Sequence, residues 1–234
     1  MIAKLLRLSI VIGVVTGAGP IVQAGAIAII DPSFEDVNAV TNAGQQWTST
    51  NATTGWVTGN GGTQDPTSNN FGGTAPDGSR VAFTQGKNLL IQDVGKVILA
   101  PQQQFELAVY VGARNDGTPF GSYQLKLAYG TTDFSTTTVF ATVIPNQTPD
   151  PGKYILVTLH GLAPTAAVGK ELWVELEGSV QTVGQKLTSN LWDNVRLNTF
   201  PPSGPNVAVP EPGTLAIVAF GSVLAVSLRL RRRR

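Results

Sequence analysis

FELAVYVG, residues 105–112, is the stretch of sequence that decides the fold class. Every second residue from Phe105 to Val111 is apolar, and successive side chains of a strand point to opposite faces, so one face is dry and the other is wet. Residues 123–129 and 171–177 alternate in the same way. This pattern is typical of antiparallel sheets that pack face to face.

Short β-rich runs separated by turn residues recur along the chain, and no stretch keeps a helical period of apolar residues over three turns. The predicted strands are residues 26–30, 80–84, 89–94, 105–112, 122–129, 137–144, 154–160, 171–177 and 191–198. They predict one all-β domain over residues 25–200, an antiparallel β-sandwich of the jelly-roll type. Residues 38–75, rich in Thr, Asn, Gly and Gln, are predicted to be loops over one end.

The first 24 residues have the layout of a secretory signal peptide. Lys4 and Arg7 precede an apolar run over residues 8–15, and small residues follow at the positions that a signal peptidase reads. We expect cleavage after Ala24, with Ala26 as the alternative.

The last 34 residues form a linker and a tail with three parts. Residues 201–208 carry the Pro, Ser and Gly of a linker. The tail, residues 209–234, contains Pro210, Glu211 and Pro212, then an uncharged run over residues 213–228, and ends in an arginine cluster at Arg229, Arg231, Arg232, Arg233 and Arg234. A helix over the apolar run and the next two residues would be about 27 Å long, close to the ~30 Å core of a bilayer. We therefore expect a transmembrane helix with its arginines in the cytoplasm.

These three parts resemble, in order, the PEP-CTERM sorting signal of Gram-negative bacteria. The resemblance implies that Pro210, Glu211 and Pro212 are recognised by an exosortase, a membrane enzyme that processes the tail. It implies export across the inner membrane and a final place at the cell surface or in the extracellular matrix. An ordinary single-pass anchor is the alternative.

Composition and charge exclude several classes of site. The chain of 234 residues has no cysteine and one histidine, which excludes a disulfide scaffold, a thiolate metal site and a multi-histidine zinc site. The formal net charge is +1, but without the two end segments nine basic residues face fourteen acidic ones. An acidic domain argues against a nucleic-acid partner and is compatible with a calcium site.

Two motifs of the domain resemble galactose-binding-like jelly rolls, a group that includes carbohydrate-binding modules. They are residues 32–36 (PSFED), followed by Gly55 and Trp56, and residues 191–197 (LWDNVRL). The resemblance implies a structural calcium ion between the first and last strands, with Glu35 and Asp193 as ligands; Asp31 and Asp36 are further candidates. The alternative is that Glu35 and Asp193 are surface charges at strand ends.

Sugar binding requires a flat apolar surface beside polar groups, because a sugar ring is amphipathic. The candidate residues in the predicted loops are Trp47, Trp56, Phe71, Arg114 and Asp116. The alternative for Trp56 is a place in the core.

The sequence offers little for catalysis. His160 lies at a predicted strand end, where a single histidine is usually a surface residue, and no Gly-x-Ser-x-Gly motif is present. Glu175 and Glu177 share one face of a strand, with Cα atoms about 6.6 Å apart, within the range of glycosidase carboxylates. We expect a non-catalytic protein that binds or organises exopolysaccharide. A purely structural biofilm or envelope component and a glycan-active hydrolase are the alternatives.

Overall fold

The computed structural model describes residues 24–36, 55–59, 61–66, 73–131, 136–179, 182–184 and 186–202. The predicted signal peptide (except Ala24), Trp47, Phe71 and the sorting tail with its predicted helix lie outside these residues. A search of the described residues finds no helix with the length and apolarity needed to span a membrane.

Strands make up nearly all the regular structure of the described residues. They are β1 (Gly25–Ile27), β2 (Val57–Thr58), β3 (Gly61–Gln64), β4 (Val81–Gln85), β5 (Asn88–Val97), β6 (Gln104–Gly112), β7 (Tyr123–Gly130), β8 (Thr138–Val143), β9 (Tyr154–Leu162), β10 (Glu171–Gly178), β11 (Thr182–Val183), β12 (Lys186–Leu187) and β13 (Ser189–Phe200). One 3₁₀ turn, η1 (Thr165–Ala167), precedes β10.

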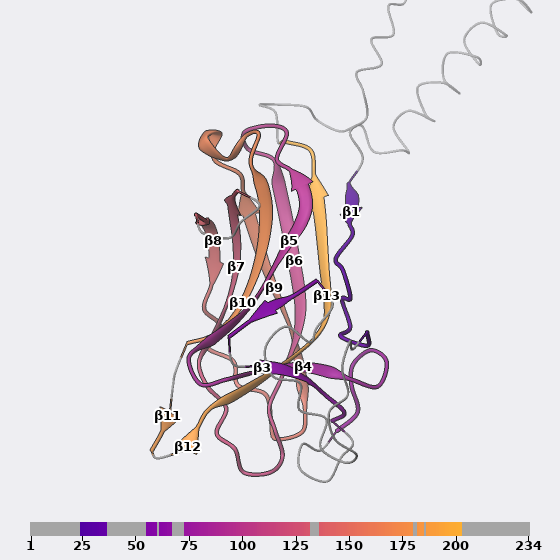
Figure 1. The fold of residues 1–234 in the computed structure, drawn as a ribbon, viewed down its shortest axis with the longest axis vertical. Coiled ribbons are helices and arrows are strands. Elements are labelled where there is room, and N and C mark those ends of the chain that lie inside the picture. The colour runs from indigo at the N-terminus through magenta and orange to yellow at the C-terminus, as the bar shows by residue number, and fades with distance from the viewer. Residues whose placement is uncertain are drawn as a thin grey trace, which may run out of the picture.

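These strands form two large antiparallel sheets that are packed face to face (Figure 1). One sheet has the order β3-β4-β13-β6-β9, with β1 also paired to β13, and the other has the order β2-β5-β10-β7-β8. The strands β4 to β10 and β13 have the order of a jelly roll: they alternate between the sheets except for β7 and β8, which are neighbours in one sheet. The short strands β11 and β12 form a separate hairpin.

The core lies between the sheets and is built from the alternating residues. Leu107 and Val109 of β6 and Leu125 and Leu127 of β7 are fully buried in one apolar cluster, as is Leu172 of β10. The dry faces predicted from period-two alternation are therefore confirmed for strands of both sheets. Trp192 of β13 is also fully buried and donates its indole N–H to Thr84 Oγ1 at 3.0 Å.

All nine predicted strands are present, with ends that differ by a few residues. The prediction that residues 38–75 are all loop was wrong, because β2 and β3 lie within them. β3 contains Gly61 and Gly62 and no large apolar side chain, so no alternation marks it in the sequence. It forms because it pairs with β4 along residues 61–64.

The described chain enters and leaves the sandwich at the same end. Gly25 of β1 pairs with Thr199 of β13, and β13 ends one residue later at Phe200 (upper end in Figure 1). The β11–β12 hairpin and the turn after β6 lie at the opposite end, where Lys186 donates to the carbonyl of Gly117.

Candidate functional site

The turn at residues 77–80 binds carboxylates from both ends of the domain. Its amide at Asp77 donates to Asp193 Oδ2 at 2.8 Å. The amides of Ser79 and Arg80 donate to Glu35 Oε1 at 2.7 and 2.6 Å, and Ser79 Oγ donates to Glu35 Oε2 at 2.9 Å. One four-residue turn therefore brings the first segment of the domain next to its last strand.

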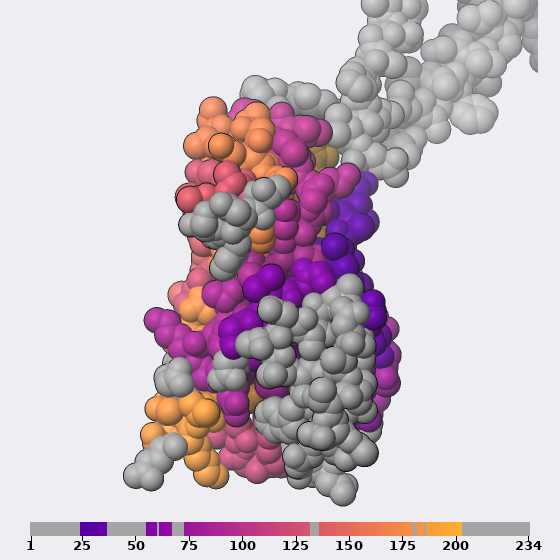
Figure 2. Space-filling model, in the orientation of Figure 1, coloured from indigo at the N-terminus to yellow at the C-terminus, as the bar shows by residue number. Residues whose placement is uncertain are grey.

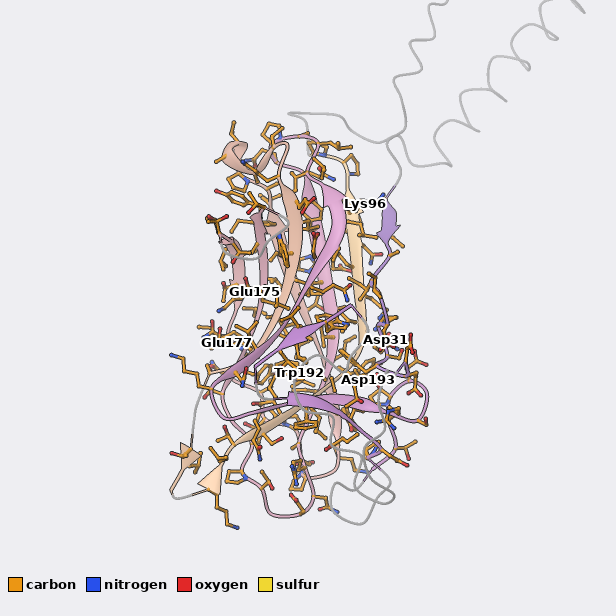
Figure 3. All side chains as sticks on the ribbon, viewed as in Figure 1. Asp31, Lys96, Glu175, Glu177, Trp192 and Asp193 are labelled. Carbon is orange, nitrogen blue, oxygen red and sulfur yellow. The ribbon has the colours of Figure 1, made fainter. Side chains whose placement is uncertain are left out.

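The carboxyl group of Asp193 lies in a strongly negative and buried environment. Its side chain is fully buried on β13 (lower right in Figure 3). Its pKa is raised to about 7, chiefly by burial and also by the charges of Asp77 and Glu35, while hydrogen bonds from the amides of Asp77 and Asn194 act in the opposite direction. A cation at this position would favour the ionised form.

Asp31 contributes a further carboxylate to this region. Its Oδ1 accepts the amide of Asp36, whereas its Oδ2 is buried and has no hydrogen-bond partner among the described residues. Burial raises the pKa of Asp31, as do the charges of Asp36 and Glu35, while hydrogen bonds from the backbone lower it.

The backbone around these carboxylates adopts the left-handed conformation at three non-glycine residues. Asp31, Phe34 and Asn194 have φ values of 47°, 57° and 48°. Asn194 lies in a bulge of β13 against β6, and the next amide, that of Val195, donates to the Pro32 carbonyl at 2.9 Å. Left-handed residues other than glycine are uncommon and gather at functional sites.

The predicted calcium ligands are thus close together, but no metal group is complete among the described residues. Glu35 and Asp193 are linked through residues 77–80 and influence each other electrostatically, as the resemblance implied. Asp193 is not the surface charge of the alternative reading, whereas Glu35 is exposed. No set of three or more His, Asp or Glu side chains in the described ranges is arranged to hold a metal ion. Calcium binding stays a prediction.

A second candidate site is a polar groove of about 440 Å³ at the lower end of the sandwich. Two of its lining residues, Arg114 and Asp116, were predicted from the sequence as sugar-binding residues, and Lys186 comes from the β11–β12 hairpin. Its remaining lining residues are Gln85, Gly117, Thr118, Pro119 and Leu187.

The Arg114–Asp116 pair gives this groove a fixed charge pattern. Arg114 is 7% exposed and donates to both oxygens of Asp116, through Nε at 3.1 Å and through Nη2. Burial opposes ionisation of Asp116, but hydrogen bonds from Arg114 and Thr118 and the guanidinium charge outweigh it and lower its pKa. The carboxylate therefore keeps its charge at neutral pH.

The three aromatic candidates do not contribute to this groove in the described structure. Trp56 is 2% exposed, packs in the core against Phe34 with ring centroids 5.3 Å apart, and donates its indole N–H to the Ile30 carbonyl. Its buried ring offers no platform to a sugar, because core packing covers it, so the alternative given for Trp56 holds. Trp47 and Phe71 lie outside the described residues.

A third group lies on the outer face of the β5-β10-β7 sheet. Glu175 is 6% exposed, so it is not the solvent-facing residue that the strand pattern indicated. Lys126 Nζ lies 3.9 Å from Glu175 Oε2 and forms a close ion pair with Glu177 (left in Figure 3). Burial raises the pKa of Glu175 and the charge of Glu177 adds to this, while Lys126 and a hydrogen bond from Thr137 lower it.

His160 is a surface residue, as the sequence indicated. Its side chain is 73% exposed, and Nδ1 lies 3.7 Å from Glu106 Oε2. The sequence did not single out Asp77, Ser79 or Lys186 as site residues. The sequence around Asp77, Pro76-Asp77-Gly78, is typical of a turn, but it does not show which residues that turn contacts.

Comparison with solved structures supports the fold of the sandwich. Crystal structures of the Stig cyclase Fisc from Fischerella sp. TAU match with a TM-score of 0.62 and 22% identity, over 77% of this chain and the whole of that chain. One of these structures, with the same identity and a TM-score of 0.61, contains 4-(1H-indol-3-yl)butan-2-one. The CBM22-2 xylan-binding domain of Paenibacillus barcinonensis Xyn10C matches with a TM-score of 0.44 and 11% identity, over 63% of this chain and 92% of that domain. No curated protein matches the sequence.

Two family models match the chain. The PEP-CTERM protein-sorting motif matches residues 208–234, which confirms the resemblance of the tail to this sorting signal; its transmembrane helix stays a prediction. The motif marks an exported protein that an exosortase processes at the cell envelope. The HpiC1-like model, described as HpiC1 cyclase, matches residues 25–198, which include every strand of the sandwich except the last two residues of β13. The chain therefore belongs to the HpiC1-like family and carries a PEP-CTERM sorting motif at its C-terminal end.

Proposed function

We propose that this exported protein binds an extracellular polysaccharide at the groove lined by Arg114, Asp116 and Lys186, without chemical change to the glycan. The observation that carries the proposal is the convergence of these three charged groups from two separate segments on one groove of about 440 Å³. Such a protein would work at the cell surface or in the matrix after sorting.

The composition of the groove matches the chemistry of a sugar. Hydroxyl groups need both donors and acceptors, which the guanidinium, carboxylate and ammonium groups supply. Pro119 and Leu187 line the same groove and offer apolar surface to the C–H face of a ring. The Arg114–Asp116 pair is held by two hydrogen bonds, so little side-chain entropy is lost on binding.

Titration of the full chain against a panel of neutral and acidic glycans tests this proposal. Lys186→Ala should weaken binding of the glycan found by about tenfold, which corresponds to ~1.4 kcal/mol. Lys153→Ala, which removes an exposed lysine that does not line the groove, is the matched control and should leave affinity unchanged. Absence of binding across the whole panel would overturn the proposal and favour a purely structural role.

We also propose that a structural calcium ion binds beside Asp31, Glu35 and Asp193, with nearby backbone carbonyls and water as further ligands. The buried Asp31 Oδ2 without a described partner and the crowding of negative charge on Asp193 fit a cation that takes only oxygen ligands. Bound calcium would neutralise this charge and join the two ends of the domain.

A chelator melt tests the calcium proposal. EGTA should lower the melting temperature of the wild-type chain, and calcium should restore it. Asp31→Asn should melt at a temperature that EGTA no longer changes, whereas Asp150→Asn, an exposed carboxylate outside the proposed ligand set, should respond like the wild type. A wild-type melting temperature that EGTA leaves unchanged would refute calcium binding.

Acid catalysis is a second candidate function. Two observations favour it: the chain belongs to a family whose model is described as HpiC1 cyclase, and the carboxyl group of Glu175 is buried. A carboxyl group with a raised pKa keeps its proton to higher pH and can donate it to a substrate. The test is turnover of 4-(1H-indol-3-yl)butan-2-one and of chromogenic glycans. Product formation by the wild type that is lost in Glu175→Gln would support an enzyme. Consumption of the indole would indicate a cyclase, and consumption of a glycan would indicate a glycoside hydrolase.

A further inference from the structure

The upper end of the sandwich is built from two loops that lie side by side. The amide of Ile98 donates to the Lys170 carbonyl, and the amide of Gly169 donates back to Ile98. Gln102 donates to Ala163 in the same way. Figure 2 shows these segments together at the top of the molecule, in magenta and orange.

Large apolar side chains of these loops are open to water. Leu99 is 79% exposed, Leu162 52%, Val97 47% and Val168 39%. Single exposed apolar residues are normal on a protein surface, but a group of them on one end marks a site of interaction with a protein or a membrane.

The position of the sorting tail indicates which partner this end meets. β13 ends at Phe200 on the same end of the sandwich, and residues 201–212 separate it from the uncharged run that begins at Gly213. Twelve residues in an extended polyproline-like chain reach about 37 Å at most. The tether therefore joins the domain at its upper end, and while the tail is in the bilayer it keeps that end within this distance of the lipid.

The upper end also carries cations. Lys96 and Lys170 are exposed beside the apolar side chains, and Figure 3 places Lys96 near the upper end. The carboxyl groups of Asp93 and Glu171 oppose these two cations, and a hydrogen bond with Asp93 raises the pKa of Glu171. The carboxylates of Asp31 and Asp193 lie lower in the same view.

We propose that the upper end docks on the bilayer that holds the sorting tail, with Leu99, Leu162 and Val168 inserted among the lipid headgroups. The two lysines contact lipid phosphates at the same surface. The docked state presents the linker to the membrane-embedded sorting enzyme and leaves the groove at Arg114 open to solvent. The inference rests on insertion of the tail and is independent of glycan binding.

The chain contains no cysteine, so one introduced cysteine carries one environment-sensitive fluorophore. The full chain is inserted into vesicles of phosphatidylethanolamine and phosphatidylglycerol that contain no other protein. A probe at Leu99→Cys should shift its emission to the blue and be quenched by spin-labelled lipid. A probe at Asn115→Cys, in the loop at the opposite end, should stay in water. A third probe, at Ala219→Cys in the apolar run, reports insertion of the tail.

Matched variants identify the surface responsible. Leu162→Asp, combined with Leu99→Cys, should abolish the quenching. Leu156→Asp is the control, because Leu156 lies on the same strand with a similar exposure of 47%, but about 20 Å farther from the upper end at 3.3 Å per residue.

Each pattern of probes decides the inference. A quenched Ala219 probe with a Leu99 probe that stays in water would overturn docking and leave the sorting tail intact. An unquenched Ala219 probe would overturn the membrane tether and docking with it. Equal loss of quenching in both aspartate variants would show that any added charge disturbs the complex, and would overturn the assignment to the upper end.

Discussion

The carboxylate of Asp193 accepts a hydrogen bond from the backbone amide of Asp77 at 2.8 Å, across 116 residues of sequence. The same turn continues to Glu35, whose Oε1 accepts the amides of Ser79 and Arg80. The first segment and the last strand of the domain are therefore joined through a third segment rather than directly by their side chains. The conformation of that turn determines how close the carboxylates lie.

Gly78→Ala should destabilise the domain more than an ordinary glycine substitution in a turn. Gly78 has a φ of 68°, and an added Cβ would overlap the carboxyl group of Glu35. The left-handed conformation alone costs roughly 1–2 kcal/mol for a residue with a Cβ. Displacement of Glu35 from the turn adds to this cost. Thermal or urea unfolding measures the total.

Gly117→Ala is the matched control for Gly78→Ala. Gly117 has a similar φ of 78°, and an added Cβ would meet no atom within 4 Å. Its loss of stability should be limited to the conformational cost of roughly 1–2 kcal/mol. Equal destabilisation by both variants would show that the contact of residues 77–80 with Glu35 contributes nothing to stability.

The stability of the domain should fall with rising pH because of Glu175. Burial raises its pKa above the ordinary value of 4.5, so the folded state binds the proton more tightly than the unfolded state. This contribution is fully present below the unfolded pKa and is lost as pH rises through the folded pKa. Glu175→Gln should show a smaller fall than the wild type when unfolding free energies are compared across about pH 4 to 8, because Asp31 and Asp193, whose pKa values are also raised, keep their share of it.

Lys126→Met should make the fall with pH larger. The charge of Lys126 lowers the pKa of Glu175, so its removal leaves the buried carboxylate harder to ionise. Identical pH profiles for the wild type and Glu175→Gln would contradict the assignment of a raised pKa to this group.

The alternation of apolar residues was sufficient to predict the sandwich but not every strand. β6 and β10 contribute alternate apolar residues to the core from both sheets, and this alternation predicts a strand with one face in the core. β3 was not predicted because it contains glycine in place of alternating apolar residues. At Gly61 an added Cβ would overlap the Phe83 carbonyl. Glycine is needed there for close approach of two backbones, and a sequence pattern does not distinguish that need from a turn.

The sequence predicted those site residues that lie in recognisable local motifs, but not the residues that reach the sites through the fold. The motif resemblance brought Glu35 and Asp193 together, and the structure confirms their proximity. It could not identify Asp77, because the turn at residues 76–78 gives no sign of the strand it meets. The burial of Glu175 was also missed, since a strand pattern assigns a residue to a face but does not show whether that face is covered.

The bond between Trp192 and Thr84 should show energetic coupling in a double-mutant cycle. Both side chains are fully buried on the neighbouring strands β13 and β4, and the indole N–H donates to Oγ1 at 3.0 Å. Thr84→Val keeps the shape but leaves a buried donor without this acceptor, at a cost of about 1–3 kcal/mol. Trp192→Phe removes the donor and some of the ring. The double variant should lose less stability than the two single losses added together, by roughly 0.5–3 kcal/mol.

The control for this cycle is Thr158→Val, which changes an exposed threonine on β9. Combined with Trp192→Phe, its effect on stability should be additive within about 0.5 kcal/mol. Additive behaviour of the Thr84 pair in urea unfolding would mean that the hydrogen bond does not stabilise the core, and that Trp192 acts through its packing against Tyr123 alone.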